Sequence, residues 1–253
     1  MGMRGILGIL FLCITLARGQ SAPGVEFNDT AGEGKAMVQD LLTRVPAEDS
    51  EILGLIKIRP PGGRTIEVPV RMNIRVGTNG WRDIYETQPV SGIPGAILII
   101  QHQGLKPNEY LYAQFEERPA EPKLRKLEGA AIFQPFAGSD FYIADLGLEF
   151  LHWPVQRIIR KNEMRKGRSC RVVESVNPDP RPGTYSRVLS WLDFETGNII
   201  MAEGYDAQNE KLKVFSVTRI SRSEGKAQLK EVEIRNDQTD SRTRLEFNLE
   251  IDD

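Results

Sequence analysis

The sequence predicts a mainly β (α+β) protein built on a strongly curved antiparallel sheet that forms an incomplete β-barrel. Three observations predict this fold. Apolar and polar residues alternate with a period of two over most of the chain, and short turn sequences separate the alternating runs. No helical segments recur between the runs, as a parallel α/β sheet would require. The chain has only two segments with helical spacing, and we expect both to cover the concave apolar face.

Residues 1–19 have the features of a secretory signal. One basic residue, Arg4, precedes an apolar run over 6–16, and the small residues Ala17 and Gly19 follow it. The run is too short for the roughly 20 residues that span a bilayer. We therefore expect a cleaved signal and a single exported domain over 20–253 that is not integral to a membrane.

The first helical segment is GEGKAMVQDLLTRVP, over 32–46, with Ala36, Val38, Leu41 and Leu42 near a 3.6 period and Pro46 at its end. The second is SDFYIADLGLEFLHWP, over 139–154, where Ser139 or Asp140 can cap a helix. These features predict an N-terminal helix and a mid-chain helix.

The clearest strand lies at EVPVRMNIRV, where Val68, Val70, Met72, Ile74 and Val76 alternate with polar residues. Similar runs follow, separated by turn signals such as Asn79-Gly80. We expect about ten or eleven strands, joined in hairpins.

Composition excludes several classes of function. The chain has 253 residues, of which 40% are hydrophobic and 27% charged, so it can bury a core and is not of a disordered type. Its 33 basic residues are outnumbered by 35 acidic ones even before the signal takes Arg4 and Arg18 away. No basic field remains to bind nucleic acid. The count of two histidines and two cysteines argues against a metal site or a disulfide framework.

Catalytic motifs are absent from the sequence. It contains no GxSxG, no GxxxxGK[ST] and no GxGxxG, and its histidines, His102 and His152, fit hydrogen-bonded core or rim positions. Cys170 fits a buried apolar position. We expect no enzyme, no catalytic residue, no metal and no cofactor. A pair of carboxylates acting on a polymer stays open, because such a pair leaves no signature in sequence.

Two further features have alternative interpretations. The inward-facing apolar surface is either an ordinary core or a hydrophobic ligand cavity under a helical lid. The basic run from Arg157 to Arg168 is either a solvated connector or a docking patch for an acidic partner or lipid headgroups.

Three segments resemble a known family. FAGSDFYIADL (136–146), the stretch from Tyr185 to Val217 and VEIRNDQTDSRTRLEF (232–247) are similar to the LolA-like proteins of outer-membrane lipoprotein sorting. The most specific parts are the segment Gly138-Ser139-Asp140-Phe141, the strand through Tyr185, Trp191 and Asp193, the Tyr205-Asp206 turn with Lys213 after it, and the hairpin from Asn236 to Thr243.

The resemblance implies a periplasmic carrier whose half-barrel and helical lid enclose the acyl chains of lipoproteins or lipids on the way to the outer membrane. It implies an inner-membrane release complex and an outer-membrane receptor as partners. A second interpretation is a non-transporting envelope interaction or sensor module of the same fold. The cavity candidates are Val70, Met72, Ile74, Val76, Trp81, Ile97, Ile99, Phe141, Phe150, Leu151, Trp153, Trp191 and Phe247.

Overall fold

A single antiparallel sheet dominates the computed structural model, which describes residues 30–119, 121–223 and 226–247. The segment assigned to the secretory signal lies outside these residues. One long helix, α1 (Thr30–Leu42), precedes the sheet. The strands are β1 (Ser50–Arg59), β2 (Ile66–Gly77), β3 (Gly80–Thr87), β4 (Gly95–Gln103), β5 (Lys106–Phe115), β6 (Arg125–Leu127), β7 (Val155–Arg165), β8 (Arg168–Val176), β9 (Arg187–Asp193), β10 (Ile199–Tyr205), β11 (Lys211–Ser223), β12 (Lys226–Asn236) and β13 (Ser241–Phe247). Between β6 and β7 lie the 3₁₀ turn η1 (Gly129–Phe133), the short helix α2 (Ile143–Leu146) and the 3₁₀ turn η2 (Glu149–His152).

The strand order explains why the sheet stays open. It runs β6-β5-β4-β3-β2-β1-β13-β12-β11-β10-β9-β8-β7, so the first and last strands of the chain meet in the middle. There Ile56 of β1 lies opposite Leu245 of β13. β6 and β7, which are consecutive along the chain, form the two opposite edges of the sheet. The mainly β, curved antiparallel prediction is therefore confirmed, although the described residues form 13 strands in place of ten or eleven.

Part of the difference in strand number comes from the basic run, which we expected as a connector. It forms β7 and enters β8. The pairing of β7 with β8 shifts register between Ile158 and Arg160 and again between Arg160 and Glu163. These irregularities break the two-residue period, and the outer part of an edge strand needs no apolar face, so sequence alternation is weak here.

The prediction of α1 is confirmed, and a helix is present in the mid-chain segment, but it is much shorter than the sequence indicates. α1 starts at Thr30, and its Gly34 and Val38 are buried, with Gly34 directly against the backbone of Arg157 on β7. The segment 139–154 contains only the one-turn α2 and the turn η2. Leu148, between them, has a left-handed backbone (φ 48°), which ends any continuous helix.

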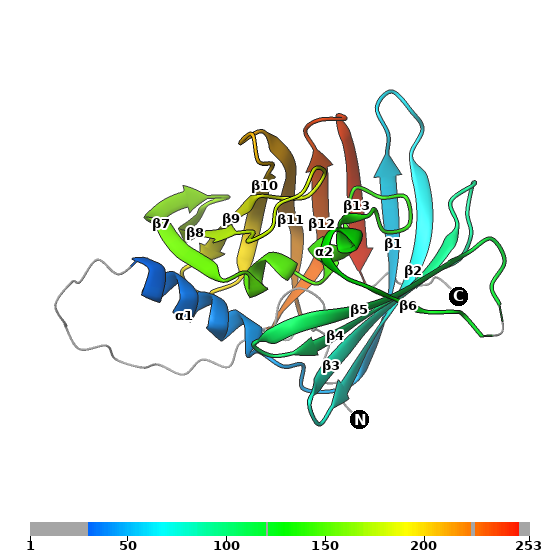
Figure 1. Cartoon of the computed structure of the whole chain (residues 1–253), viewed down its shortest axis with the longest axis horizontal. Coiled ribbons are helices and arrows are strands. Elements are labelled where there is room, and N and C mark those ends of the chain that lie inside the picture. Colours follow the sequence, from blue (N-terminus) through cyan, green and yellow to red (C-terminus); the bar gives the residue numbers. More distant parts are fainter. Residues whose placement is uncertain (1–29, 120, 224–225, 248–253) are drawn as a thin grey trace.

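We call residues 128–154 the strap, because they link β6 to β7 and therefore have to pass from one edge of the sheet to the other. Figure 1 shows the strap, with α2, in front of the central strands and running toward β7. The irregular strap, together with α1, thus takes the covering position predicted for two helices.

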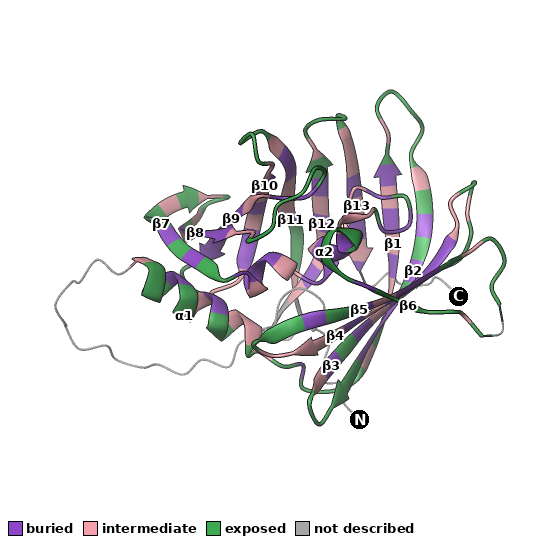
Figure 2. Ribbon diagram, in the orientation of Figure 1, coloured by how far each residue is buried: buried purple, intermediate pink, exposed green. Residues whose placement is uncertain are grey.

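The strap lies between two buried clusters on the concave side. One cluster is formed by β1–β6, β11–β13 and the first part of the strap, with Met72, Ile74 and Leu98 as fully buried members. The other is formed by α1, η2 and β7–β11. Figure 2 shows buried residues recurring along the strands of both halves. Partly buried residues pack against both clusters: Phe133, Tyr142 and Leu148 of the strap, and Phe215 of β11.

Candidate functional site: an apolar pocket under the strap

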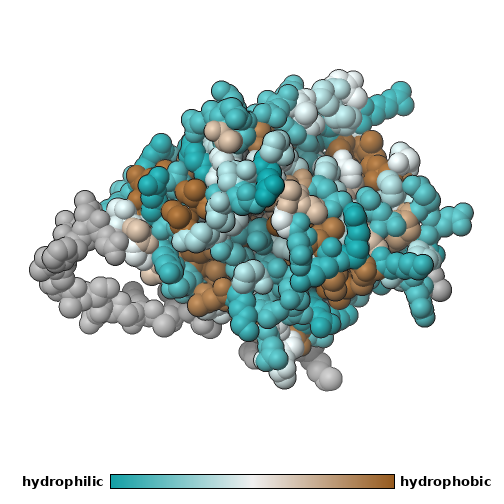
Figure 3. Space-filling model, in the orientation of Figure 1, coloured by the Kyte–Doolittle hydropathy of each residue, from teal (hydrophilic) through white to brown (hydrophobic). Residues whose placement is uncertain are grey.

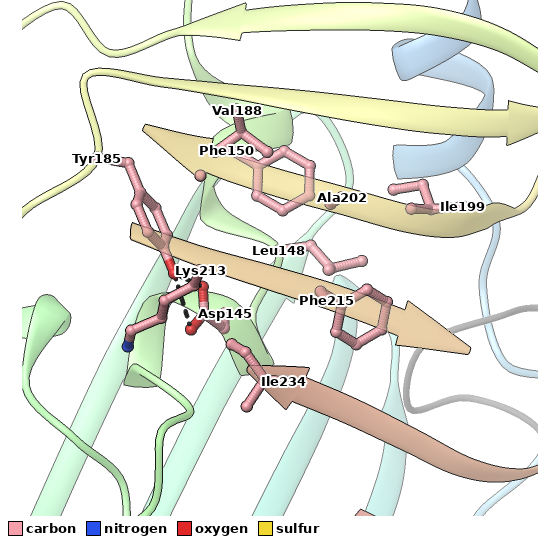
Figure 4. A pocket seen from close by; sticks show the side chains of 11 residues that line it. Asp145, Leu148, Phe150, Tyr185, Val188, Ile199, Ala202, Lys213, Phe215 and Ile234 are labelled. Atoms are coloured by element: carbon pink, nitrogen blue, oxygen red, sulfur yellow. Dashed lines mark hydrogen bonds between the residues drawn. The ribbon is translucent and has the colours of Figure 1, made fainter. Parts of the chain in front are cut away.

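A narrow pocket lies between the strap and strands β9–β12 (Figure 4). Its walls are mostly apolar: Leu148 and Phe150 of the strap, with Val188, Ile199, Ala202, Phe215 and Ile234 of the sheet. The space left between these side chains is about 30 Å³, which is room for a water molecule or two and not for an acyl chain. In this conformation the strap fills the place beneath it with its own side chains.

Charged groups mark one end of the pocket. In Figure 4, Tyr185, Asp145 and the amine of Lys213 lie together on the side away from Ile199. The Tyr185 hydroxyl donates to the Asp145 carboxylate at 3.0 Å. Burial raises the pKa of Asp145 and lowers the pKa of Lys213 to about 8, so the loss of solvent outweighs the attraction between the two charges. The pocket is therefore amphipathic along its length.

The strap is held at the middle of the sheet by Asp140. Its carboxylate accepts hydrogen bonds from the hydroxyls of Ser241 (2.5 Å) and Thr243 (2.9 Å) on β13, and the Asp140 backbone N–H bonds to Thr243 at 3.0 Å. Lys213 donates from Nζ to the Asp140 carbonyl at 2.6 Å, and this nitrogen lies 2.9 Å from the centre of the Tyr142 ring. We call Asp140, Lys213, Ser241 and Thr243 the central latch.

A second set of contacts holds the strap nearer the β6 edge. Asn108 donates from Nδ2 to the Gly147 carbonyl at 2.8 Å, and the Tyr110 hydroxyl donates to Glu149 at 2.8 Å. A Cβ on Gly147 would lie 2.3 Å from that hydroxyl, so only glycine allows the approach. Burial raises the pKa of Glu149 to about 7, against the opposing effects of Tyr110 and His102. We call Asn108, Tyr110, Gly147 and Glu149 the β5 latch.

Most of the predicted cavity residues are buried on the concave side, but in two separate clusters. Val70, Met72, Ile74, Trp81, Phe141 and Phe247 belong to the first cluster. Phe150, Leu151 and Trp153 belong to the second, and of all the predicted residues only Phe150 lines the pocket.

Four predicted residues lie elsewhere. Trp191 sits in a third cluster with Cys170, on the opposite face from its neighbour Leu192. Ile97 and Ile99 alternate with Ala96, Leu98 and Ile100 of the first cluster, so they face the convex side. Val76 follows the phase of Ile74 but lies at the end of β2 and is 37% exposed. Strands β4 and β9 carry apolar residues on both faces, so alternation alone misassigned the orientation of Ile97, Ile99 and Trp191.

The pocket contains residues that the sequence analysis did not propose as site residues. Lys213 is 3% exposed and shares the inward phase of Phe215 on β11. A charged residue in phase with an apolar face is a signal that could have identified it. The segments that resemble the family are distant in sequence but meet at the strap. Asp145 of the strap contacts Tyr185, and Asp140 of the strap contacts Lys213 and the 236–243 hairpin.

The basic run is largely neutralised within the described structure. Arg157 pairs with Glu174, Arg165 with Glu163 and Arg168 with Asp193. Arg160 also pairs with Glu163, and Lys161 lies 3.7 Å from Glu33 of α1. These contacts argue against a docking patch, since most of the positive charge already has a partner, and the run itself is strand β7 and not a connector.

Within the described residues, none of the helices combines the length and the apolar character that a membrane crossing requires. The face drawn in Figure 3 is mostly hydrophilic, with hydrophobic side chains in separate patches. His102, one of the two histidines, is bound to Asp83 at 3.0 Å and stacks on Trp81, as a rim position predicts.

Comparison with known proteins identifies relatives of the fold. A family model described only as "Uncharacterized protein" matches residues 87–252. No curated protein matches the chain. Among solved structures, a DUF1329 family protein from Desulfovibrio piger is 17% identical, with TM-score 0.69, over 88% of this chain and 95% of its own. A Vibrio parahaemolyticus domain named for outer membrane lipoprotein sorting is 17% identical, with TM-score 0.68, over 85% and 90%. A LolA superfamily protein from Nitrosomonas europaea is 15% identical, with TM-score 0.60, over 87% and 92%. At these identities the similarity concerns the fold.

Proposed function

The chain belongs to the family whose model matches residues 87–252, its own fold is LolA-like, and from this premise we propose that it is a periplasmic carrier that shields the acyl chains of lipoproteins or lipids. The names of two structural neighbours, one a lipoprotein-sorting domain and one a LolA superfamily protein, support a carrier over an enzyme. Export by the segment 1–19 would place the protein between the two membranes.

One observation carries this proposal: the apolar face of the sheet is covered by a strap that has little regular structure of its own. Leu148 and Phe150 of the strap occupy the concave side against Phe215 and other apolar residues of the sheet. An ordinary core is usually covered by regular helices or a second sheet. A strap fixed by a few polar contacts can instead lift, and a ligand can then replace its apolar side chains.

The energetics of such an exchange fit a carrier. Each acyl CH₂ removed from water contributes about 0.8 kcal/mol, so a long chain binds without polar recognition. For a ligand to enter, the contacts of Leu148 and Phe150 with the sheet must break, together with the hydrogen bonds of at least one latch. In the closed form the strap covers the apolar face of the sheet, so the protein without ligand exposes no large apolar patch. This stable empty state allows the protein to release its ligand to a receptor.

The first test is native mass spectrometry of the exported protein, purified without detergent, followed by solvent extraction. We expect a co-purified lipid or acylated peptide, or saturable binding of a fluorescent fatty acid by the empty protein. An empty protein that also fails to bind the fatty acid would contradict the carrier and favour the non-transporting interaction module.

A substitution in the pocket links binding to this site. Ala202 lines the pocket and is 6% exposed. We expect Ala202→Leu, which fills the remaining space, to weaken fatty-acid binding by roughly tenfold, the effect of about 1.4 kcal/mol. The matched control is Ala47→Leu, an exposed position between α1 and β1. Equal affinities for the two variants would place the ligand elsewhere.

A further inference from the structure

A second hollow lies on the side of the strap that faces β5 and β6. It has a volume of about 450 Å³, against about 30 Å³ for the apolar pocket. Its base includes the buried residues Asn108, Tyr110, Leu127 and Ile132, and Glu149 of η2 lies beside them. The strap therefore directs Leu148 and Phe150 to the apolar pocket and Glu149 to this polar groove.

The base of the groove holds a hydrogen-bond acceptor without a partner. Asn108 is 9% exposed, and its Nδ2 donates to the Gly147 carbonyl at 2.8 Å and to the Tyr110 hydroxyl at 3.3 Å. A carbonyl only accepts, so the contact with Gly147 fixes which end of the amide is nitrogen. The other end, Oδ1, is buried and has no hydrogen-bond partner among the described residues. Buried acceptors of this kind are rare in native proteins and call for a donor.

The charges around this acceptor favour a cationic donor. Glu149 contributes a carboxylate at the base, and Glu109 and Glu128 contribute carboxylates at the exposed rim. Two exposed lysines also line the groove. Lys126 is paired with Glu128 at 2.8 Å, so the remaining charges are the carboxylates of Glu149 and Glu109 against the amine of Lys106. Burial raises the pKa of Glu149 to about 7, although the Tyr110 hydrogen bond and the charge of His102 lower it. The charged form of this carboxylate is therefore incompletely stabilised, and a cation bound beside it would stabilise it further.

The donor set suits an organic cation better than a metal ion. Within the described residues, no three His, Cys, Asp or Glu side chains come together in a way that could hold a metal ion. A primary ammonium group needs less: its three N–H bonds can be shared among an amide oxygen, a carboxylate and water. We propose that this groove is a binding site for a primary ammonium group, carried either by a lipid headgroup or by a free amine.

The site has a direct mechanical link to the strap. Asn108 and Glu149 face the groove and also form the β5 latch. An ammonium group bonded to Glu149 competes with Tyr110 for the carboxylate, so its binding alters one of the contacts that hold the strap. The proposal does not depend on the carrier function, since a protein that binds no acyl chain could still bind a free amine.

Calorimetric titration with ethylammonium chloride tests the site, with tetramethylammonium chloride as a cation that has no N–H donor. We expect saturable binding of ethylammonium only, and at least a tenfold loss of affinity in Glu149→Gln. The glutamine keeps the size of the side chain and can still accept from Tyr110, and a thermal melt checks that the variant folds. Glu117→Gln, at an exposed position, is the matched control.

The source of the ammonium group is separated by two further titrations. Dihexanoyl phosphatidylethanolamine binding much more tightly than ethylammonium, with dihexanoyl phosphatidylglycerol inactive, would identify a lipid headgroup. Equal affinities of the ethanolamine lipid and ethylammonium would identify a free amine. No binding of any primary ammonium compound at tens of millimolar, equal binding of tetramethylammonium, or an unchanged affinity in Glu149→Gln would overturn the proposal, and none of these results bears on fatty-acid binding in the apolar pocket.

Discussion

The strap is held in two different ways at its two attachments. The central latch offers one carboxylate, Asp140, two hydroxyl donors from β13 and a buried ammonium from β11. The β5 latch has only two hydrogen bonds to the strap, and one of them ends on Glu149, whose pKa burial raises to about 7. The difference indicates a fixed point at the middle of the sheet and a releasable point near its β6 edge.

The largest expected effect comes from removing the fixed point. Asp140→Ala deletes the acceptor of two hydroxyl groups, and Thr243, which is fully buried, loses its charged partner. Hydrogen bonds to charged groups contribute about 1.5–3 kcal/mol each, so we expect the free energy of unfolding to fall by about 4 kcal/mol in urea denaturation.

The control for this loss is Asp179→Ala, which removes an exposed carboxylate paired with Arg181. Exposed ion pairs contribute little, so the control should change stability by less than about 0.5 kcal/mol. Similar losses in both variants would mean that the central latch is not a fixed point.

The second prediction concerns the pH response of the β5 latch. The pKa of Glu149 is raised in the folded protein from 4.5 to about 7, so the folded state holds this proton more tightly than the unfolded chain. The stabilisation is therefore complete below pH 4.5 and is lost as the pH rises through 7, with an upper limit of about 3 kcal/mol. Glu149→Gln cannot titrate at this position.

Urea denaturation of both proteins at pH 5 and pH 8 measures this effect. We expect the wild type to lose stability relative to Glu149→Gln between the two values. Parallel changes in the two proteins would show that Glu149 titrates normally, and the distinction between the latches would then rest on hydrogen-bond number alone.

The smallest effect is expected from crowding the β5 latch without changing its charge. Gly147→Ala places a methyl group against the Tyr110 hydroxyl, and overpacking of this kind costs about 2 kcal/mol. The double variant Gly147→Ala, Tyr110→Phe removes the clashing hydroxyl and should recover part of the loss, as a double-mutant cycle measures. Strictly additive losses would mean that the two groups do not meet. If the β5 latch is the releasable one, Gly147→Ala should also bind a fluorescent fatty acid faster than the wild type.

The sheet could be predicted because most strands keep one dry face, as Val68 to Ile74 do. The strap could not, because its apolar residues have helical spacing although they reach the sheet from an irregular backbone with a left-handed Leu148. The prediction that Trp191 faces the concave side failed for a different reason. Strand β9 is buried on both faces, so its sequence does not alternate between apolar and polar residues and does not indicate which face is concave.

The latches show where prediction from one sequence ends. Lys213 shares the phase of the inward-facing Phe215 and could be recognised as unusual. Its partner Asp140 is 73 residues away in the sequence. The two residues come together because of the strand order and the path of the strap across the sheet. Local sequence spacing does not encode either of these.

The junction of β1 with β13 has a consequence for how the chain folds. The six strands of the first half can form hairpins as soon as they are synthesised, but β1 then presents an unpaired edge until the last strand is available. Residues such as Gly54 and Phe247, which are register partners, must close a loop that includes nearly the whole domain. High contact order of this kind slows folding, so the interval before β13 pairs with β1 is when the β1 edge is most open to wrong pairing.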